Sequence, residues 1–227
     1  MKLFIIRHGD PHYPTDSITE RGVEEAEALK MRLLRDNITK VYCSPLGRAQ
    51  QTAKPFLELT GLPCTTYDFL QEFCVPIVRD GHETCAWCLD VEYYNEHAER
   101  LQNPNDWYND EIYQRHNMKE HVDRFYEQFD ALLLENGYKR NGMMYDVMPG
   151  ADKDANIAIF CHGGLGALLL SRIVNIAPPI FWQSLKMMPT GVTTVLFTDT
   201  ATPDKAQAQI FTFSDVTHVA EIGINYK

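Results

Sequence analysis

The 227-residue sequence has no long hydrophobic run and no excess of positive charge. Its longest apolar stretches match the strands and helices of a folded core, so no membrane-spanning helix is predicted. Lysine and arginine total 21 against 31 aspartates and glutamates, a formal net charge of −10. Nucleic acids and acidic membranes select for basic surfaces, so we predict neither as a partner. The first residues lead directly into an apolar strand rather than a charged leader, and we therefore expect a cytoplasmic protein.

Cysteine is sparse and irregularly spaced. The six cysteines are Cys43, Cys64, Cys74, Cys85, Cys88 and Cys161. Free thiols are the expected state in a chain of this length without a leader. Cys85 and Cys88 have the C-x-x-C spacing of redox and zinc sites, with His82 just upstream, but the sequence lacks a second C-x-x-C. We therefore predict no metal site and no cofactor, and a thiol-redox or metal role for this pair is the minor alternative.

Apolar strands alternate with amphipathic helices along the chain. Strands are predicted at residues 2–6, 40–43, 64–69, 156–160, 192–198 and 207–213, and helices at 20–35, 46–60, 118–135 and 164–175. This order predicts an α/β fold, a three-layer sandwich in which helices flank a mostly parallel sheet. Residues 1–227 are expected to form a single domain. Within it, 73–150 are predicted to be a mostly helical lid inserted over one edge of the sheet, with loop at 137–154.

Two of the predicted strands end in a histidine followed by glycine. Arg7-His8-Gly9-Asp10 follows the first strand, and Cys161-His162-Gly163-Gly164 follows the strand at 156–160. Open α/β sheets bind ligands beyond the carboxyl ends of their strands, so neighbouring strands would bring both imidazoles to one crevice. Arg7 can hold two phosphate oxygens, and Gly9 allows the backbone to approach a ligand. A neutral His8 imidazole is a competent nucleophile.

Two further segments add to this crevice. Arg48, in Ser44-Pro45-Leu46-Gly47-Arg48, lies in the first turn of a predicted helix, where anions bind and where its own charge opposes the helix dipole. Glu72 follows the third predicted strand and can reach the same edge as a proton donor. Two arginines, two histidines and one carboxyl group form a complete set for phosphoryl transfer without a metal ion. Glu83, within the predicted lid, is the alternative acid.

These motifs together resemble those of the histidine phosphatase superfamily, the phosphoglycerate mutase-like group. The matching segments are Arg7–Asp10, Thr19–Ala26, Ser44–Thr52, Leu70–Glu72 and Cys161–Gly164, in the family's order. The resemblance implies that His8 is phosphorylated in the reaction and that Arg7, Arg48 and His162 hold the phosphoryl oxygens. It implies acid catalysis by Glu72, although the following Phe73-Cys74-Val75-Pro76 departs from the family's glycine-rich continuation. Gly9, Thr19 and Gly163 are the residues predicted to bind substrate.

The first motif also departs from the family's mutases. These usually continue it with Glu, Ser and a Trp-Asn pair in a longer loop, whereas this chain continues with Asp10-Pro11-His12-Tyr13-Pro14. A mutase must retain and reorient its phosphorylated product, while a phosphatase only needs water to enter. We therefore predict a metal-independent phosphatase that hydrolyses a small phosphorylated metabolite. A phosphoglycerate mutase and a non-catalytic phosphate-binding protein are the alternatives.

Aromatic side chains are frequent in the predicted lid. They are Trp87, Tyr93, Tyr94, Trp107, Tyr108 and Tyr113. Aromatic residues are the main buried side chains of small subdomains, so a core of the lid itself is the favoured interpretation. Stacking on an organic leaving group is the alternative, to which His12 and Tyr13 could also contribute.

Overall fold

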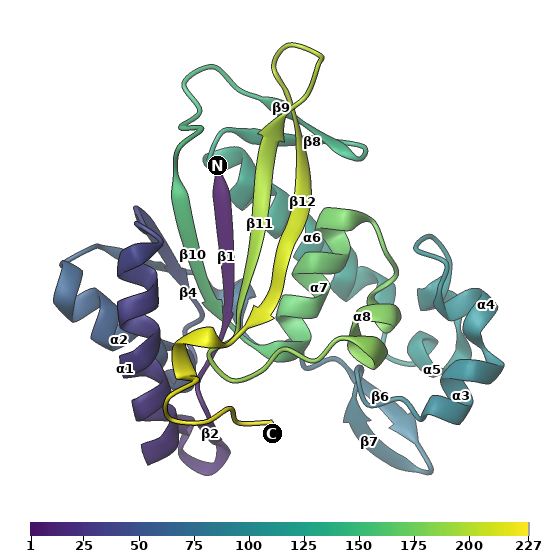
Figure 1. The fold of residues 1–227 in the computed structure, drawn as a ribbon. Helices are drawn as coiled ribbons and strands as arrows, with labels where there is room; N and C mark the ends of the chain where they lie inside the picture. The colour runs from purple at the N-terminus through teal and green to yellow at the C-terminus, as the bar shows by residue number, and fades with distance from the viewer. Residues whose placement is uncertain (227) are drawn as a thin grey trace.

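The central sheet is built around two apolar strands, β1 (Lys2–Arg7) and β10 (Asn156–Cys161), which pair in parallel with Leu3 opposite Ile157. The computed structural model describes residues 1–226 and contains an 8-stranded sheet of order β5-β4-β10-β1-β11-β12-β9-β8 (Figure 1). The other strands are β4 (Lys40–Cys43), β5 (Cys64–Thr66), β8 (Tyr138–Asn141), β9 (Met144–Val147), β11 (Val192–Asp199) and β12 (Lys205–Asp215). Since β11 and β9 alone run opposite to the rest of this sheet, the predicted mostly parallel arrangement is confirmed.

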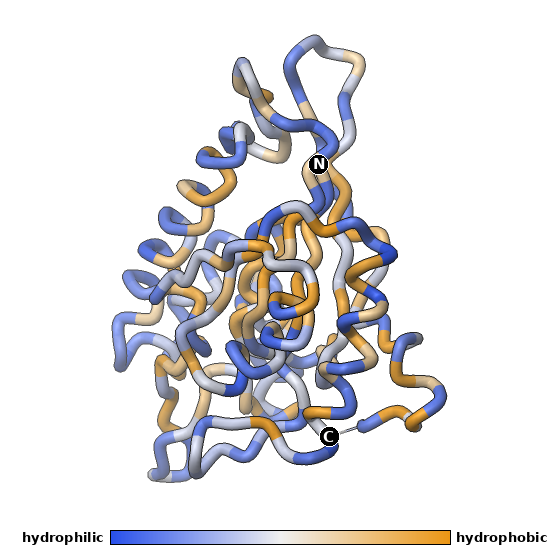
Figure 2. Tube along the Cα trace, turned by 90° about the vertical axis from the view of Figure 1, so that its left-hand side faces the viewer, coloured by the Kyte–Doolittle hydropathy of each residue, from blue (hydrophilic) through white to orange (hydrophobic). Residues whose placement is uncertain are grey.

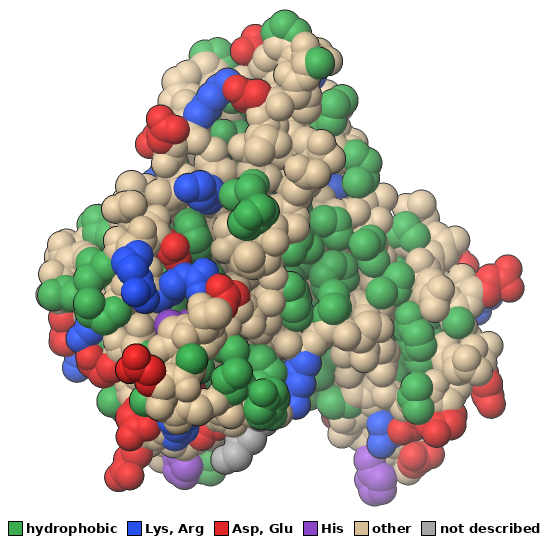
Figure 3. Space-filling view, in the orientation of Figure 1, with side chains coloured by type: hydrophobic (Ala, Val, Ile, Leu, Met, Phe, Trp, Pro, Cys, Tyr) green, Lys and Arg blue, Asp and Glu red, His purple; other side chains and the backbone are tan. Residues whose placement is uncertain are grey.

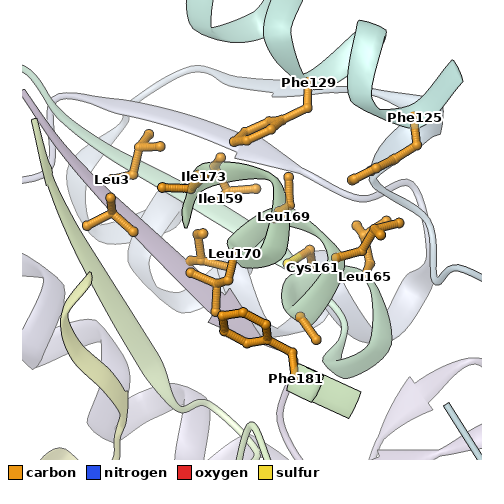
Figure 4. Close-up of a cluster of buried hydrophobic side chains, with 14 of the residues drawn as sticks. Leu3, Phe125, Phe129, Ile159, Cys161, Leu165, Leu169, Leu170, Ile173 and Phe181 are labelled. Atoms are coloured by element: carbon orange, nitrogen blue, oxygen red, sulfur yellow. The ribbon is translucent and has the colours of Figure 1, made fainter. Parts of the chain in front are cut away.

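Helices cover both faces of this sheet. Leu3 and Ile5 of β1 point into one apolar cluster, and Phe4 and Ile6 point into the other. Helices α1 (Glu20–Arg35) and α2 (Gly47–Thr60) cover the Phe4 face, while α6 (Met118–Glu135) and α7 (Gly163–Val174) cover the Leu3 face (Figures 1 and 4). Strands buried on both faces have no polar alternation, which explains their continuous apolar sequences. The hydrophobic segments accordingly lie inside and the hydrophilic ones along the outer turns (Figure 2).

Residues 73–150 divide into a separate lobe and a part that joins the central layers. The lobe contains the hairpin β6 (Pro76–Arg79) and β7 (His82–Cys85) and the short helices α3 (Val91–Glu96), α4 (Ala98–Leu101) and α5 (Glu111–Gln114) (Figure 1). Trp107 and Tyr113 are buried in it and contact the ring of Trp182 from α8 (Pro178–Ser184). Trp107 and Tyr113 are thus buried, as the favoured interpretation of the lid aromatics expected, but their core is not the lid's own, because it continues through Trp182 into the central layers.

Two boundaries differ from the sequence-based expectation. The loop predicted at 137–154 is wrong for residues 138–147, where β8 and β9 form a hairpin that extends the central sheet around Gly142, whose φ is 62°, and it is confirmed for residues 148–154. Tyr138, Tyr145 and Val147 supply the hairpin's buried positions, a pattern hidden by the charged residues between them. The strand predicted at 64–69 ends at Thr66, and a 3-10 turn at Asp68–Leu70 follows it.

Smaller elements complete the fold beside the carboxyl ends of the parallel strands. β2 (Pro11–His12) and β3 (Ser17–Ile18) form a short hairpin after β1, with a 3-10 turn at Tyr13–Thr15 between them. Further 3-10 turns lie at Trp107–Asn109 in the lobe and at Thr217–Val219.

Among residues 1–226, no helix has the length and apolar character needed to cross a bilayer.

The packing of α6 generates a stability prediction. Phe129 is 0% exposed in the core beneath α6 (Figure 4), whereas Phe211 of β12 is 70% exposed. Phe129→Ala should lower the free energy of unfolding by about 3–5 kcal/mol, because lost burial and a residual cavity add. Phe211→Ala should change it by less than about 0.5 kcal/mol. Urea denaturation of both variants measures the difference, and equal midpoints would show that α6 is not packed as described.

Candidate active site

Parallel pairing of β1 with β10 brings the two histidines together. Arg7 lies opposite Cys161 in the register, so His8 and His162 follow at the same edge of the sheet, and the His8 N–H donates to the Cys161 carbonyl over 3.0 Å. The centroids of the two imidazole rings are 5.2 Å apart. The condition for a shared crevice, that these two strands are neighbours, is therefore met. Both rings occupy the crevice at the carboxyl ends of the strands.

His8 is held as a neutral imidazole with one free nitrogen. Its side chain is buried, and its Nδ1 lies 2.7 Å from the Gly9 carbonyl. A carbonyl oxygen only accepts, so Nδ1 carries the proton and Nε2 carries the lone pair. Burial lowers the pKa of His8 to about 3, and the charges of Arg7 and Arg48 add to this effect. His8 is therefore uncharged at neutral pH, with Nε2 available as a nucleophile.

His162 is similarly buried but has a different free nitrogen. Its Nε2 lies 2.8 Å from Ser44 Oγ, while its buried Nδ1 has no hydrogen-bond partner among the described residues. Burial lowers the pKa of His162 to about 2, and His8 and the two arginines lower it further. Ser44 has this contact because it follows β4, the next strand beyond β10. Ser44 lies in the same motif as Arg48, but its contact with His162 was not predicted from the sequence.

Arg48 approaches from the first turn of α2, where it is buried. It forms an ion pair with Asp16, whose other oxygen accepts from the Gly47 N–H over 2.6 Å. Burial of Asp16 acts to raise its pKa, but these hydrogen bonds prevail and hold it below its usual range. The Arg48 Nε is buried without a hydrogen-bond partner in residues 1–226. Buried polar groups are rarely left unpaired, so Arg48 Nε and His162 Nδ1 together indicate a place for an anion.

Glu72 reaches the site from the 3-10 turn after β5. Its Oε1 accepts from the Leu165 N–H over 2.8 Å and the Phe73 N–H over 3.0 Å, while Oε2 has a longer contact of 3.4 Å with the Gly164 N–H. Burial raises the pKa of Glu72, although these N–H groups and Arg48 oppose the rise. The less engaged Oε2 is therefore the oxygen suited to hold a proton. Glu83 lies instead on β7, 3.8 Å from the Nε2 of His116.

The site opens into a pocket of about 420 Å³. Its lining is Arg7, His8, Tyr13, Glu72, Trp87, Gly163, Gly164, Ala167, Trp182, Gln183, Ser184, Leu185, Lys186 and Met187. Trp87 packs directly on α7, since a Cβ added at Gly164 would lie 2.5 Å from its ring, and the Trp182 Nε1 donates to the Gly164 carbonyl over 3.0 Å. On the face drawn in Figure 3, the surface is hollowed between the main body and the lobe. Trp182 and Lys186 were missed, because the helix that precedes Lys186 carries no recognisable motif.

The predicted substrate-binding residues lie in two different places. Gly163 lines the pocket, but within residues 1–226 the lining does not include Gly9 or Thr19. Gly9 packs on α1, where an added Cβ would come within 2.9 Å of the Gly22 carbonyl oxygen. Thr19 caps α1 by accepting from the Gly22 N–H over 3.1 Å, and its hydroxyl donates to Asp10. The contacts of Gly9 and Thr19 position the segment that follows His8, and their binding of substrate stays a prediction.

Of the other residues near the site, one lines the pocket and two lie outside its lining. Tyr13 lines the pocket, and its ring centroid is 5.5 Å from the Arg48 guanidinium carbon, whereas His12 points to solvent and bonds Thr15. His218 contacts Thr190, whose N–H donates to the His8 carbonyl over 3.3 Å. In the described part of the chain, no cluster of three or more His, Cys, Asp or Glu side chains is arranged to hold a metal ion.

Two curated proteins are similar in sequence to this chain. An adenosylcobalamin/alpha-ribazole phosphatase of Escherichia coli (strain K12) is 27% identical over 198 residues, which are 81% of this chain and 84% of that protein. A protein of Yersinia pestis (strain Pestoides F) named as a probable phosphoglycerate mutase is 29% identical over 89 residues, 35% of this chain and 41% of that protein. The chain is thus similar to both a phosphatase and a mutase.

Solved structures and a family model extend the similarity to nearly the whole chain. A phosphoserine phosphatase of Entamoeba histolytica in complex with phosphoserine superposes with a TM-score of 0.64 at 18% identity, covering 96% of this chain and 98% of that one. A mycobacterial glucosyl-3-phosphoglycerate phosphatase gives 0.61 at 17% identity, covering 94% and 98%. The family model of the histidine phosphatase superfamily (branch 1) matches residues 3–204. The chain therefore belongs to the histidine phosphatase superfamily.

Proposed function

We propose that the protein is a metal-independent phosphatase that hydrolyses a small phosphomonoester through a phosphohistidine at His8. The observation that carries this proposal is that the ring centroids of His8 and His162 are 5.2 Å apart, and that His162 Nδ1 and Arg48 Nε are buried without a hydrogen-bond partner in residues 1–226. A phosphoryl group at this position would receive hydrogen bonds from both, given a proton on His162 Nδ1. Arg7, which lines the same pocket, adds a second positive charge. Such preorganised donors stabilise the charge of a transferring phosphoryl group.

The reaction follows from the free atoms of the site. The His8 Nε2 attacks phosphorus, and the bond to the leaving oxygen breaks while Glu72 Oε2 gives that oxygen its proton. A water molecule then attacks the phosphorus of phosphohistidine and transfers a proton to Glu72, and the bond between phosphorus and Nε2 breaks. Inorganic phosphate leaves, and both His8 and Glu72 return to their starting protonation states. The walls formed by Trp87 and Trp182 lie where the leaving group would be held.

Hydrolysis is favoured over mutase activity by the segment after His8. That segment is a short hairpin and a single 3-10 turn, without the longer loop usual in mutases of the family. Relatives and structural neighbours are named for several different phosphorylated compounds. A panel of phosphorylated metabolites, assayed for phosphate release and for conversion of 3-phosphoglycerate to its 2-isomer, distinguishes the two activities. Isomerisation without phosphate release would favour the mutase, and neither activity would favour a phosphate-binding protein.

The first prediction concerns the covalent intermediate. The protein is allowed to react with a ³²P-labelled phosphomonoester and is then quenched rapidly without acid. A base-stable, acid-labile label should be found on the peptide that contains His8. His8→Ala should lose both label and turnover, because no other group supplies the nucleophile. His12→Ala, which alters an exposed histidine nearby, should retain both. The assay includes a chelator, since the mechanism uses no metal. Turnover by His8→Ala at the wild-type rate would eliminate the proposed intermediate.

A second prediction tests the guanidinium of Arg48. Arg48→Lys keeps the positive charge but removes Nε and the planar set of donors. The loss of a transition-state hydrogen bond of this kind should lower kcat about a hundredfold to a thousandfold. Arg35→Lys, a change at an exposed arginine, is the matched control and should leave kcat unchanged. A decrease of less than a few-fold in a correctly folded Arg48→Lys protein would assign Arg48 a structural role.

The third prediction separates acid catalysis from phosphate binding. Glu72→Gln should slow hydrolysis of an alkyl phosphate far more than that of p-nitrophenyl phosphate, because p-nitrophenolate departs without protonation. Glu83→Gln serves as the control at the alternative acid and should affect neither substrate. Equal losses on both substrates in Glu72→Gln would mean that Glu72 positions phosphate or water. A selective loss in Glu83→Gln would transfer the acid role to that residue.

A fourth prediction concerns the protonation of the two histidines. With pKa values lowered to about 3 for His8 and about 2 for His162, both rings stay neutral as the pH falls from 8 to 5 in the ligand-free protein. Ring ¹⁵N chemical shifts should therefore remain constant over this range, with signals assigned from His8→Gln and His162→Gln variants. A midpoint near the ordinary histidine value of about 6.5 would contradict the described burial of these rings.

A further inference from the structure

The turn between β7 and α3 holds two thiols close together. It consists of Cys85-Ala86-Trp87-Cys88, and the Cys88 N–H donates to the Cys85 carbonyl over 2.9 Å. Such a turn brings its first and fourth Cα atoms within about 7 Å, the upper end of the range a disulfide spans. Both cysteines are free and half-buried. The C-x-x-C spacing in the sequence is therefore a spatial pair.

Three side chains donate hydrogen bonds to the backbone of this turn and of the residue that follows it. The Tyr113 hydroxyl donates to the Ala86 carbonyl over 3.1 Å, and Arg79 donates to the Cys88 carbonyl over 2.7 Å. Just beyond the turn, Gln183 donates to the Leu89 carbonyl over 3.1 Å, and Gln183 itself lines the pocket. A change in the backbone of the turn would therefore be transmitted to the pocket.

Trp87 connects the thiol pair to the candidate active site directly. It stands between the two cysteines in the sequence, and its ring covers Gly164 at the start of α7. That first turn of α7 also supplies the N–H groups that hold Glu72. The pair therefore flanks a tryptophan that packs on the same turn of α7 that holds the proposed acid.

We propose that Cys85 and Cys88 form a reversible disulfide site whose co-reactant is a small-molecule disulfide, and that its closure moves the Trp87 wall of the pocket. The modification site itself goes beyond the proposed phosphatase activity. Its effect on substrate binding rests on that activity. The site needs no metal ion and no residue of the phosphoryl-transfer machinery.

The exchange proceeds in two steps of thiolate attack. One cysteine thiolate attacks a sulfur of the small disulfide, forms a mixed disulfide and releases one small thiol. The thiolate of the other cysteine then attacks the protein sulfur, forms the Cys85–Cys88 bond and releases the second small thiol. The protein loses two electrons and two protons, and the co-reactant gains them as two thiols. Excess dithiol reductant reverses both steps.

The other cysteines provide internal controls. Cys43 and Cys161 are buried in the central layers, whereas Cys74 is exposed and lies near Cys85. Burial raises the pKa of the Cys85 thiol to about 11, with Cys88, Cys74 and Glu72 adding to the rise. Exchange is therefore best followed at a mildly alkaline pH, where more thiolate is present.

Mass spectrometry of the full-length protein tests the site. Trypsin cleaves after Arg79 and Arg100, so Cys85 and Cys88 stay on one peptide and Cys74 falls on another. After incubation with oxidised glutathione at pH 8.5, this peptide should be two hydrogens lighter and free of glutathione, and dithiothreitol should restore it. Cys74→Ser should behave identically, and Cys88→Ser should not form the bond. Unmodified thiols, a persistent glutathione adduct on either cysteine, or a link from Cys74 to Cys85 would overturn the proposal.

Kinetics on the Cys74→Ser protein test the link to the pocket. The oxidised form should show a KM for p-nitrophenyl phosphate that differs from that of the reduced form, and reduction should reverse the shift. Oxidant-treated Cys74→Ser/Cys85→Ser/Cys88→Ser protein, which has no thiol at this turn to form a mixed disulfide, is the control and should show no shift. A fully formed disulfide with identical kinetics would contradict movement of Trp87. If neither form hydrolyses any phosphomonoester, the proposed function fails while the disulfide result stands by itself.

Discussion

The parallel pairing of β1 with β10 determines where the rest of the site must lie. Because Arg7 lies opposite Cys161, His8 and His162 follow directly at the same edge of the sheet, and their ring centroids are 5.2 Å apart. A shift of one residue in this register would turn Leu3 and Ile5 toward the wrong cluster and separate the imidazoles. Formation of the core and formation of the site therefore depend on the same hydrogen-bonded ladder. The apolar strands cannot pair correctly without assembling the crevice.

Burial is the second constraint, and it acts on each group differently. Desolvation disfavours the charged form of a titratable group, so it keeps His8 and His162 neutral while it raises the pKa of Glu72. Arginine cannot give up its proton in this way, and Arg48 therefore remains positive beside Asp16. A single property of the crevice thus leaves an imidazole with a free lone pair and a carboxyl group whose pKa is raised, both close to a positively charged guanidinium. The net charge of −10 does not exclude an anionic ligand, because Arg7 and Lys186 line the pocket.

Much of this arrangement could be predicted from the sequence, and the reasons are specific. Strong 3.6-residue periodicity located helices 20–35 and 118–135 at their observed bounds, and glycine after each histidine marked the ends of the critical strands. The hairpin at Tyr138–Val147 was missed because its buried tyrosines are separated by charged residues. Gly9 and Thr19 were expected at the ligand, but short residues in a motif can equally serve close packing, which only the three-dimensional contacts distinguish. Trp182 and Lys186 line the pocket because of tertiary packing alone, and no local sequence pattern predicts such a position.

The central claim is that His8 Nε2 faces a phosphoryl position served by Arg48 Nε and His162 Nδ1. A crystal structure with orthovanadate tests it most directly, because vanadate adopts the trigonal-bipyramidal geometry of the transferring group. We predict vanadium bound at the Nε2 of His8, with equatorial oxygens that accept hydrogen bonds from Arg48 Nε and His162 Nδ1, and an apical oxygen directed toward Glu72. Vanadate bound away from His8, or bound there while both of these nitrogens remain without a partner, would contradict the account.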